Sequence, residues 1–454
     1  MNTKILVIAA VAIVAVAGIG GAVYALTSSN NNGGSSFEYT NRLLVYGNAD
    51  NNNYLDNDDV KLIEKIIKDG NWTEVKSQYP YADANKDSYL NDDDVKVVKK
   101  FLNGEAETMY YTDWNLGTSS IKYPLTGKIA GTYDSSLWFA QLLGVYDDMT
   151  YLCRTQAYID DLSTKMFPGA ATRLVAQGSN GHFEMEKLIA NNIKIALGDP
   201  FGIDATFLAN VEANPACGIQ PILLPENREI NGLNWSNSVV TLGVMFNKQD
   251  KTNEYIEYIE KVEKKVKEKV VEATKDQKDL TYLLIYAEPG DSGVGLDVRS
   301  TGTTQYGDVV NVETLPLTCA IKGSKSNWVD SSVEGVLAVD PDVIIFTAWG
   351  PFQKGYTEQQ YKDFIKEKMQ DYKNSSAYKN GRVYSISFEV YGTLPGIAGI
   401  PYLGSQIWPD LFDEQEGIDL LQEYFDKFTA IKGTDVKTYP TLLPLTQKDI
   451  EGTA

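Results

Sequence analysis

One long, highly charged helical segment divides most of this chain into two halves of similar pattern. Within residues 250–275, Tyr255, Ile259, Val262 and Val266 recur at helical spacing, and Lys and Glu fill most other positions. About 24 helical residues make a rod of roughly 36 Å. On both sides of it, short apolar runs alternate with helical patterns, an order typical of parallel sheets with crossover helices. The sequence therefore predicts an α/β fold with two lobes joined by one rigid helix.

The apolar runs set the boundaries of the two lobes. We expect buried strands at residues 128–131, 173–176, 193–197, 221–224, 282–286, 340–346 and 381–386, and a last helix near 417–430. The predicted units are lobe 1 at 115–248, the connecting helix at 249–278, lobe 2 at 279–432 and a C-terminal tail at 433–454.

Two segments that precede the lobes repeat one pattern of side-chain oxygens. Loop 1 runs from Asn48 to Asp59 and loop 2 from Asp83 to Asp94, and a helix pattern follows each. Oxygen-bearing side chains stand at positions 1, 3, 5, 9 and 12, and position 7 offers its backbone carbonyl, which is the spacing that calcium needs. The predicted ligands are Asn48, Asp50, Asn52, Tyr54, Asp56, Asp59, Asp83, Asn85, Asp87, Tyr89, Asn91 and Asp94. The alternative is a pair of solvated turns, because Asn and Asp favour turns in any case.

The two loops together resemble a type I dockerin module covering residues 43–105. As in that family, Asp stands at position 12 of each loop, whereas Asn53 and Ser88 stand at position 6, where Gly is usual. The resemblance implies a small all-α module with two calcium ions and a cohesin-domain partner. In the family, positions 10 and 11 help to select the cohesin, and here these positions are acidic or amide residues.

An uncharged apolar run occupies residues 5–26, with Lys4 before it. At about 1.5 Å per residue it spans roughly 33 Å, enough to cross a bilayer. We expect an uncleaved transmembrane anchor at 1–27, a flexible linker at 28–42, and the bulk of the chain outside the cell. A cleaved signal peptide is the alternative.

Charge and rare residues exclude several classes of function. A formal net charge of −20 argues against a nucleic-acid partner, because a phosphate backbone would be repelled. A single histidine, His182, excludes a metal site built from several histidines. Cys153 and Cys217 allow either a disulfide or two free thiols, since an extracellular location permits both.

Three local patterns, in order after the connecting helix, carry a second resemblance. Residues 339–350 (VDPDVIIFTAWG), 377–387 (AYKNGRVYSIS) and 404–412 (GSQIWPDLF) are similar to segments of the class III substrate-binding proteins of ABC transporters, the iron-siderophore, haem and cobalamin type. The resemblance covers about residues 115–432. Lobe 1 departs from it, because Asn191-Asn192-Ile193 stands where Pro-Asp is usual. The resemblance implies a non-enzymatic receptor that delivers a metal chelate to an ABC permease.

In two-lobed binders the ligand lies between the lobes, held by loops at strand ends. Arg299 and Arg154 fall in such loops and are predicted clamps for an anionic group, with Arg299 favoured. The other predicted ligand contacts are Trp138, Trp349 and Tyr391 by stacking, His182 by ligating iron, and Glu389 as a polar contact. Each has an alternative structural role: a surface or packing arginine, a core aromatic, a hydrogen-bonded loop histidine or a salt-bridged glutamate.

The predicted function is therefore a membrane-anchored solute receptor with a calcium module for surface assembly. Two alternatives belong to other classes. One is a dockerin-bearing cell-surface enzyme acting on glycans, and the other is an adhesion or scaffold protein.

Overall fold

The computed structural model describes residues 42–153, 161–173, 175–176, 182–200, 202–273, 280–287, 293–348, 357–439 and 442–452. None of the helices in these ranges combines the length and the apolar character that a membrane span requires. The predicted anchor at residues 5–26 and nearly all of the predicted linker lie outside them.

Lobe 1 contains a five-stranded parallel sheet in the order β5-β4-β3-β6-β7. Its strands are β3 (Lys128–Gly131), β4 (Met149–Leu152), β5 (Val175–Ala176), β6 (Ile193–Leu197) and β7 (Gln220–Ile222). Its helices are α4 (Ser135–Leu142), α5 (Asp161–Met166), α6 (Ala170–Arg173), α7 (Met185–Ala190), α8 (Ala205–Ala213) and α9 (Trp235–Met245). The short apolar runs form the sheet because strands buried on both faces need continuous apolar sequence.

Lobe 2 contains a mixed sheet in the order β13-β10-β9-β14-β15-β16, with β12 also paired to β9. The strands are β9 (Leu280–Tyr286), β10 (Val294–Asp297), β12 (Leu317–Cys319), β13 (Trp328–Ser331), β14 (Val343–Ala348), β15 (Val383–Ser387) and β16 (Leu445–Thr446). The helices are α11 (Gly307–Val312), α12 (Val333–Val339), α13 (Glu358–Met369), α14 (Ser376–Lys379), α15 (Phe388–Tyr391), α16 (Gly396–Ile407), α17 (Glu414–Phe428) and α18 (Gln447–Glu451). The α/β fold with two lobes that the sequence predicts is confirmed.

The predicted C-terminal tail is an integral part of lobe 2. Strand β16 pairs antiparallel with β15, placing Tyr384 opposite Thr446. The Lys366 ammonium donates to the backbone carbonyl of Glu451 at 2.8 Å, which holds α18 beside α13. The boundary expected at residue 432 therefore does not separate a tail from a lobe.

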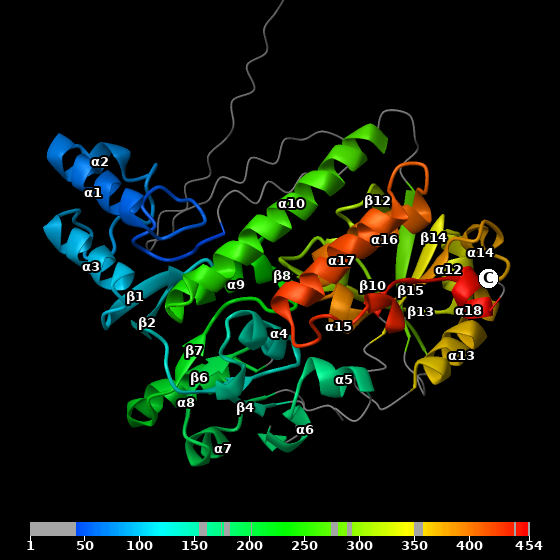
Figure 1. Ribbon diagram of the computed structural model, residues 1–454, viewed down its shortest axis with the longest axis horizontal. Coiled ribbons are helices and arrows are strands. Elements are labelled where there is room, and N and C mark those ends of the chain that lie inside the picture. The colour runs from blue at the N-terminus through cyan, green and yellow to red at the C-terminus, as the bar shows by residue number, and fades with distance from the viewer. Residues whose placement is uncertain are drawn as a thin grey trace, which may run out of the picture.

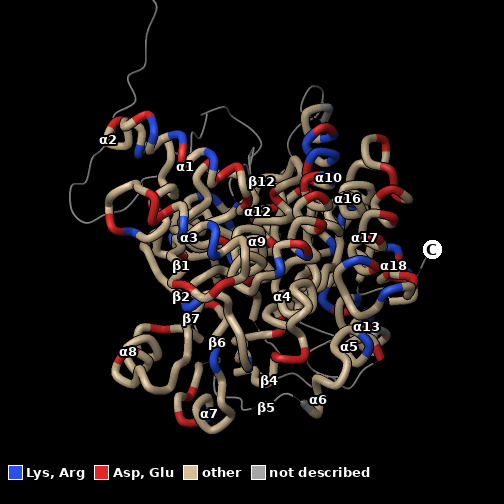
Figure 2. The backbone as a smooth tube through the Cα atoms, turned by 60° about the vertical axis from the view of Figure 1, so that its left-hand side comes forward, with Lys and Arg blue, Asp and Glu red and all other residues tan. Residues whose placement is uncertain are grey.

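The connecting helix is α10 (Gln249–Ala273), and its predicted apolar stripe is buried. A second helix, α17, lies alongside it (Figure 1). The Tyr258 hydroxyl of α10 donates to the backbone carbonyl of Leu420 in α17 at 2.8 Å. Lys261 pairs with Glu423 across the two helices, and Figure 2 shows acidic and basic positions together along α10. The lobes are therefore braced by two helices, where the sequence predicts one.

A short β-ladder also joins the lobes. Strand β8 (Arg228–Ile230), which follows the lobe 1 sheet, pairs antiparallel with β11 (Thr304–Tyr306) of lobe 2. The backbone amide of Gly307 donates to the carbonyl of Asn227 at 3.2 Å. A Cβ atom at Gly307 would lie 2.0 Å from the carbonyl oxygen of Gly392, so only glycine allows this close approach.

The N-terminal module contains α1 (Asn57–Asp69), α2 (Trp72–Val75) and α3 (Asp92–Leu102). A hairpin of β1 (Glu107–Thr112) and β2 (Thr118–Tyr123) connects it to lobe 1, and Val45 forms an antiparallel bridge with Tyr111. Ile63 of α1 and Ile259 of α10 belong to one continuous hydrophobic core. The module is therefore packed onto lobe 1 and the start of α10 (Figure 1).

Candidate functional site

Charged side chains from both lobes meet at the junction formed by β8 and β11. We call this set the inter-lobe cluster: Asp199, Glu226, Arg228, Glu229, Asp297, Arg299, Asp308 and Glu313. Asp199 and Glu226 follow the carboxyl ends of β6 and β7, which is the edge of a parallel sheet where α/β proteins place functional residues.

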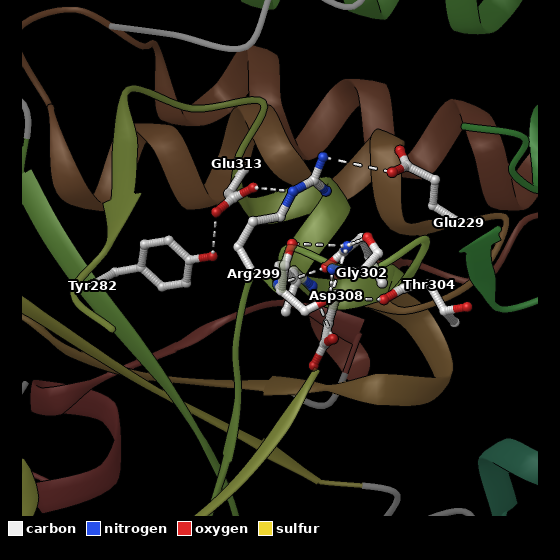
Figure 3. Close-up of polar contacts among 10 residues, drawn as sticks. Glu229, Tyr282, Arg299, Gly302, Thr304, Asp308 and Glu313 are labelled. Carbon is white, nitrogen blue, oxygen red and sulfur yellow. Dashed lines mark hydrogen bonds and ion pairs between the residues drawn. The ribbon is translucent and has the colours of Figure 1, made fainter. Parts of the chain in front are cut away.

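Arg299 lies between two carboxylates of the protein (Figure 3). Its Nη2 atom lies 3.5 Å from Oε1 of Glu229 and its Nε atom lies 3.5 Å from Oε2 of Glu313. The hydroxyl of Tyr282 donates to the other oxygen of Glu313 at 3.0 Å. An anionic ligand at Arg299 would have to compete with these carboxylates, and the clamp role stays a prediction.

Arg228 is a second guanidinium at this junction, and the sequence reasoning missed it. Its Nε atom lies 3.5 Å from Oδ2 of Asp199, and its guanidinium stacks over the ring of Tyr306 at 4.7 Å from the centroid. This contact crosses from lobe 1 to lobe 2, since Tyr306 ends β11. Only the scarcity of arginine in the chain could have drawn attention to Arg228.

Glu226 is a fully buried carboxyl that is held by two hydroxyl groups. Ser136 Oγ donates to Glu226 Oε2 at 2.8 Å, and Ser135 Oγ donates to the same oxygen at 3.1 Å. Burial, with the nearby charge of Asp199, raises the pKa of Glu226 to about 8. Glu226 is therefore mostly protonated at neutral pH, and its charge contributes little to the cluster.

Asp297 and Asp308 form a buried carboxyl pair in lobe 2. Burial and the neighbouring carboxyl raise the pKa of Asp297 well above its usual value, and burial raises that of Asp308 to about 6. Two carboxylates in contact in a buried site cannot both stay ionised at low cost, so one of them retains a proton. The cluster thus contains more carboxyl groups than guanidinium groups, and protonation removes part of the excess negative charge.

Two predicted stacking residues are core residues instead. Trp138 is 1% exposed and packs edge-on against Phe167, with ring centroids 5.1 Å apart. Tyr391 is 0% exposed in α15. Because both side chains are buried in the core, neither ring is exposed for stacking on a ligand in this structure.

Of the remaining predicted contacts, only His182 has a side chain among the described residues. His182 is exposed, and its Nδ1 atom lies 3.2 Å from Oδ2 of Asp204. Arg154 and Trp349 lie outside the described residues, and of Glu389 only the backbone, in α15, is described. The structure shows Cys153 and Cys217 as free thiols, with Cys153 buried.

Loops 1 and 2 repeat the same internal hydrogen bonds. In loop 1, Asp59 accepts from the backbone amides of Asp50 at 3.3 Å and Asp56 at 2.8 Å. In loop 2, Asp94 accepts from the equivalent amides of Asn85 at 3.2 Å and Asn91 at 2.9 Å. The repeat seen in the sequence is therefore a repeat in conformation.

Both loops hold a buried oxygen that suits a cation. Oδ1 of Asn48 and Oδ1 of Asp83, at position 1 of each loop, are buried without a hydrogen-bond partner. Burial and the charges of Asp50 and Asp56 raise the pKa of Asp59 to about 7. A bound cation would offset the free-energy cost of ionising this carboxyl. The described residues hold no group of three or more His, Cys, Asp or Glu placed as a metal site, but a loop of this kind also uses Asn side chains and a backbone carbonyl. The residues therefore fit calcium.

Comparison with known proteins agrees with the two-lobed architecture. Residues 215–390 match a family model described as periplasmic binding protein. This match begins just before β7 and includes α10 and most of lobe 2. No curated protein matches the chain.

Solved structures of periplasmic binding proteins have the same fold. A periplasmic solute binding protein from Veillonella parvula is similar with a TM-score of 0.57 at 17% identity, covering 76% of this chain and 99% of that chain. The TroA-like periplasmic binding protein FepB from the same organism gives 0.54 at 16%, covering 72% and 97%. The molybdate periplasmic binding protein MolA from Haemophilus influenzae, bound to molybdate, gives 0.52 at 14%, covering 70% and 97%. The fold of this chain is thus periplasmic-binding-protein-like.

Proposed function

We propose that this chain is the solute-binding protein of an ABC importer and captures a metal chelate of the iron-siderophore type. The observation that carries the proposal is the architecture: two α/β lobes bridged by α10 and α17, with residues 215–390 matching the periplasmic-binding family model. The resemblance of the segments after α10 to the siderophore, haem and cobalamin class supports the choice of ligand.

The bracing of the lobes favours a binder that moves little. The two helices and the β8–β11 ladder would all have to shear if the lobes rotated far apart. Ligand binding should therefore change the overall shape only slightly. Of the segments expected to hold the ligand at the strand ends, residues 154–156, 178–181, 289–292 and 349–352 lie outside the described residues.

We further propose that the chain is held at the outer face of the membrane by residues 1–27, and that it delivers its ligand to an ABC permease there. N-terminal sequencing of protein extracted from membranes tests the anchor. A mature chain that begins near Ser28 would show that residues 1–27 are a cleaved signal peptide and not an anchor.

For the N-terminal module we propose two bound calcium ions and a cohesin-like partner. The buried, unpartnered oxygens of Asn48 and Asp83 support the ions. The exposed ring of Tyr89 in loop 2 is available to a partner. Calcium-dependent capture of one purified cohesin domain would support a cohesin-like partner. Capture that is unchanged by EDTA would argue against a calcium-dependent partner.

Titration calorimetry of the full chain tests the ligand. The panel contains ferric siderophores, haem, cobalamin and molybdate, and the variants are Arg299→Ala and, as a matched control in lobe 2, Arg382→Ala. If Arg299 holds a ligand oxygen, only its loss should weaken binding, by roughly tenfold to a hundredfold. A chain that binds none of these ligands and converts a glycan to products would be an enzyme, and the receptor proposal would fail.

A further inference from the structure

Loops 1 and 2 share the hydrogen bonds to Asp59 and Asp94 but differ in their surroundings. Within the described part of the chain, no hydrogen bond or ion pair joins residues 83–94 of loop 2 to either lobe. Loop 1, in contrast, is attached to α10 at two of its positions. The near-identity of the loops makes each a natural control for the other.

The first attachment is at position 8 of loop 1. The side-chain amide of Gln249, the first residue of α10, donates to the backbone carbonyl of Leu55 at 3.0 Å and accepts from its backbone amide at 2.9 Å. Both backbone groups of Leu55 are thereby fixed by one side chain. Leu55 itself is buried in the core that the module shares with lobe 1.

The second attachment is at position 6. The Asn53 side chain accepts from the backbone amide of Arg42 at 2.9 Å and donates to Glu260 of α10 at 3.1 Å. Arg42 is buried and pairs with Glu263, one turn further along the same helix, at 2.6 Å. At the equivalent position of loop 2, Ser88 has φ +76° and its amide donates to Asp83. In loop 1 the equivalent position-1 oxygen, Oδ1 of Asn48, has no hydrogen-bond partner.

Positions 6 and 8 supply no side-chain ligand to calcium in a loop of this type, but they flank position 7, whose backbone carbonyl is a ligand. Gln249 and Asn53 therefore hold the chain on both sides of Tyr54 and leave the side chains of the ligand positions free. Fixing a ligand before binding lowers the conformational entropy that binding must remove.

We propose that α10 pre-organises loop 1 for calcium, so that calcium binding in loop 1 and docking of the module on α10 reinforce each other, while loop 2 binds independently of α10. The inference rests on the calcium sites proposed above. Because coupling between two equilibria is reciprocal, calcium in loop 1 should also tighten the attachment of the module to the helix that bridges the lobes.

Calcium titration by calorimetry on full-length variants tests this inference. Asp94→Asn disables loop 2 and leaves loop 1, and Asp59→Asn does the reverse. Gln249→Ala is then added to each. The matched control is Gln415→Ala, the same change in the first turn of α17, where the side-chain amide donates to Asp419 of its own helix.

Gln249→Ala should weaken calcium binding about tenfold in the chain that keeps loop 1 and less than twofold in the chain that keeps loop 2. Gln415→Ala should leave both affinities unchanged. Far-UV circular dichroism confirms that each variant is folded. As a second measurement, calcium should slow amide hydrogen exchange in the first turns of α10 only in the chain that keeps loop 1.

An equal effect of Gln249→Ala on both loops, or no effect on either, would overturn the coupling. If the unmodified chain takes up no calcium, the calcium proposal fails and the coupling with it. That outcome is distinguishable, because it appears before any variant is compared, and it leaves the solute-binding proposal untouched.

Discussion

Arg299 of lobe 2 contacts Glu229 of the strand that lobe 1 contributes to the junction, with Nη2 and Oε1 3.5 Å apart. Glu229 is buried, and Arg299 lowers the pKa of this carboxyl against the larger effect of burial, which raises it. The pKa of Glu313, on the other side of the guanidinium, is likewise raised by burial and lowered by Arg299. The arginine therefore compensates two carboxylates at once, one from each lobe.

Replacing Arg299 by alanine should destabilise the protein even without ligand. The buried Glu229 and the partly buried Glu313 would lose their cation, and we expect a loss of about 1–3 kcal/mol at pH 7.5, measured by urea unfolding. Without Arg299 the folded-state pKa values of Glu229 and Glu313 rise further above their unfolded values. A carboxyl whose pKa is raised in the folded state makes the protein less stable as pH rises. The destabilisation caused by Arg299→Ala should therefore be smaller at pH 5 than at pH 7.5. Equal destabilisation by Arg382→Ala, or a loss that grows at low pH, would contradict this account.

Glu226→Gln should make the protein more stable at alkaline pH. The folded-state pKa of about 8 lies above the ordinary value of 4.5, so the folded protein holds a proton that the unfolded chain releases. Stability therefore falls as pH rises from about 4.5 to 8 and then levels off. Glutamine removes this dependence, and we expect the variant to be similar to the parent at pH 4.5 and more stable at pH 8.5, by roughly 3–5 kcal/mol.

Thermal melts of the two proteins across this pH range measure the difference. Glu186→Gln, an exposed glutamate of α7, is the control and should follow the parent. A pH dependence unchanged by Glu226→Gln would show that Glu226 is ionised in the folded protein.

Calcium should raise the melting temperature of the full chain. A ligand that binds only the folded state stabilises it by about 2.7 kcal/mol per site at a hundredfold excess over Kd. Asp59→Asn and Asp94→Asn should each remove the part of this stabilisation that comes from one site. Magnesium at the same concentration should stabilise the chain less than calcium, because magnesium requires a stricter octahedral geometry than such loops provide. Identical melting in calcium and in EDTA would contradict both calcium sites.

Phe425→Ala should weaken the bracing of the lobes by α17. Phe425 is fully buried, and its ring centroid lies 6.2 Å from that of Trp138 in lobe 1. Truncation of a buried phenylalanine costs about 3–5 kcal/mol, through lost burial and the cavity left behind. Urea unfolding followed by tryptophan fluorescence measures this loss. Leu116→Ala, at an exposed position, should change stability by less than about 0.5 kcal/mol.

The helix α10 could be predicted because its apolar residues follow helical spacing over many turns. Helix α17 could also be predicted, near residues 417–430, although α18 follows it. Its packing along α10 could not be predicted, because an amphipathic pattern shows which face is buried and not what covers it. The repeated loops were visible for a similar reason: their oxygens recur at fixed positions. The attachment of loop 1 to α10 depends on Gln249 and Asn53, two polar residues with no periodic signal.

The predicted ligand contacts were less accessible to sequence reasoning. Trp138 was predicted to lie in a strand-end loop, but it lies in α4, which begins at Ser135, and its side chain is buried in the core. Arg228 was missed because buried charge at a junction depends on partners far away in sequence, such as Tyr306. Sequence alone places charged residues near strand ends, but only the packing of the lobes decides which of them meet.

The contact between Trp138 and Phe425 has a consequence for the order of folding. Part of the lobe 1 core is covered by α17, a helix that follows all strands of the lobe 2 sheet except β16 in the sequence. Closing so long a loop is costly before the contact forms, so this contact should form late. While a chain is emerging from a ribosome or a translocation channel, lobe 1 should remain incompletely packed until α17 has also emerged. A pause in synthesis between the lobes would therefore leave an apolar surface open to chaperones or aggregation.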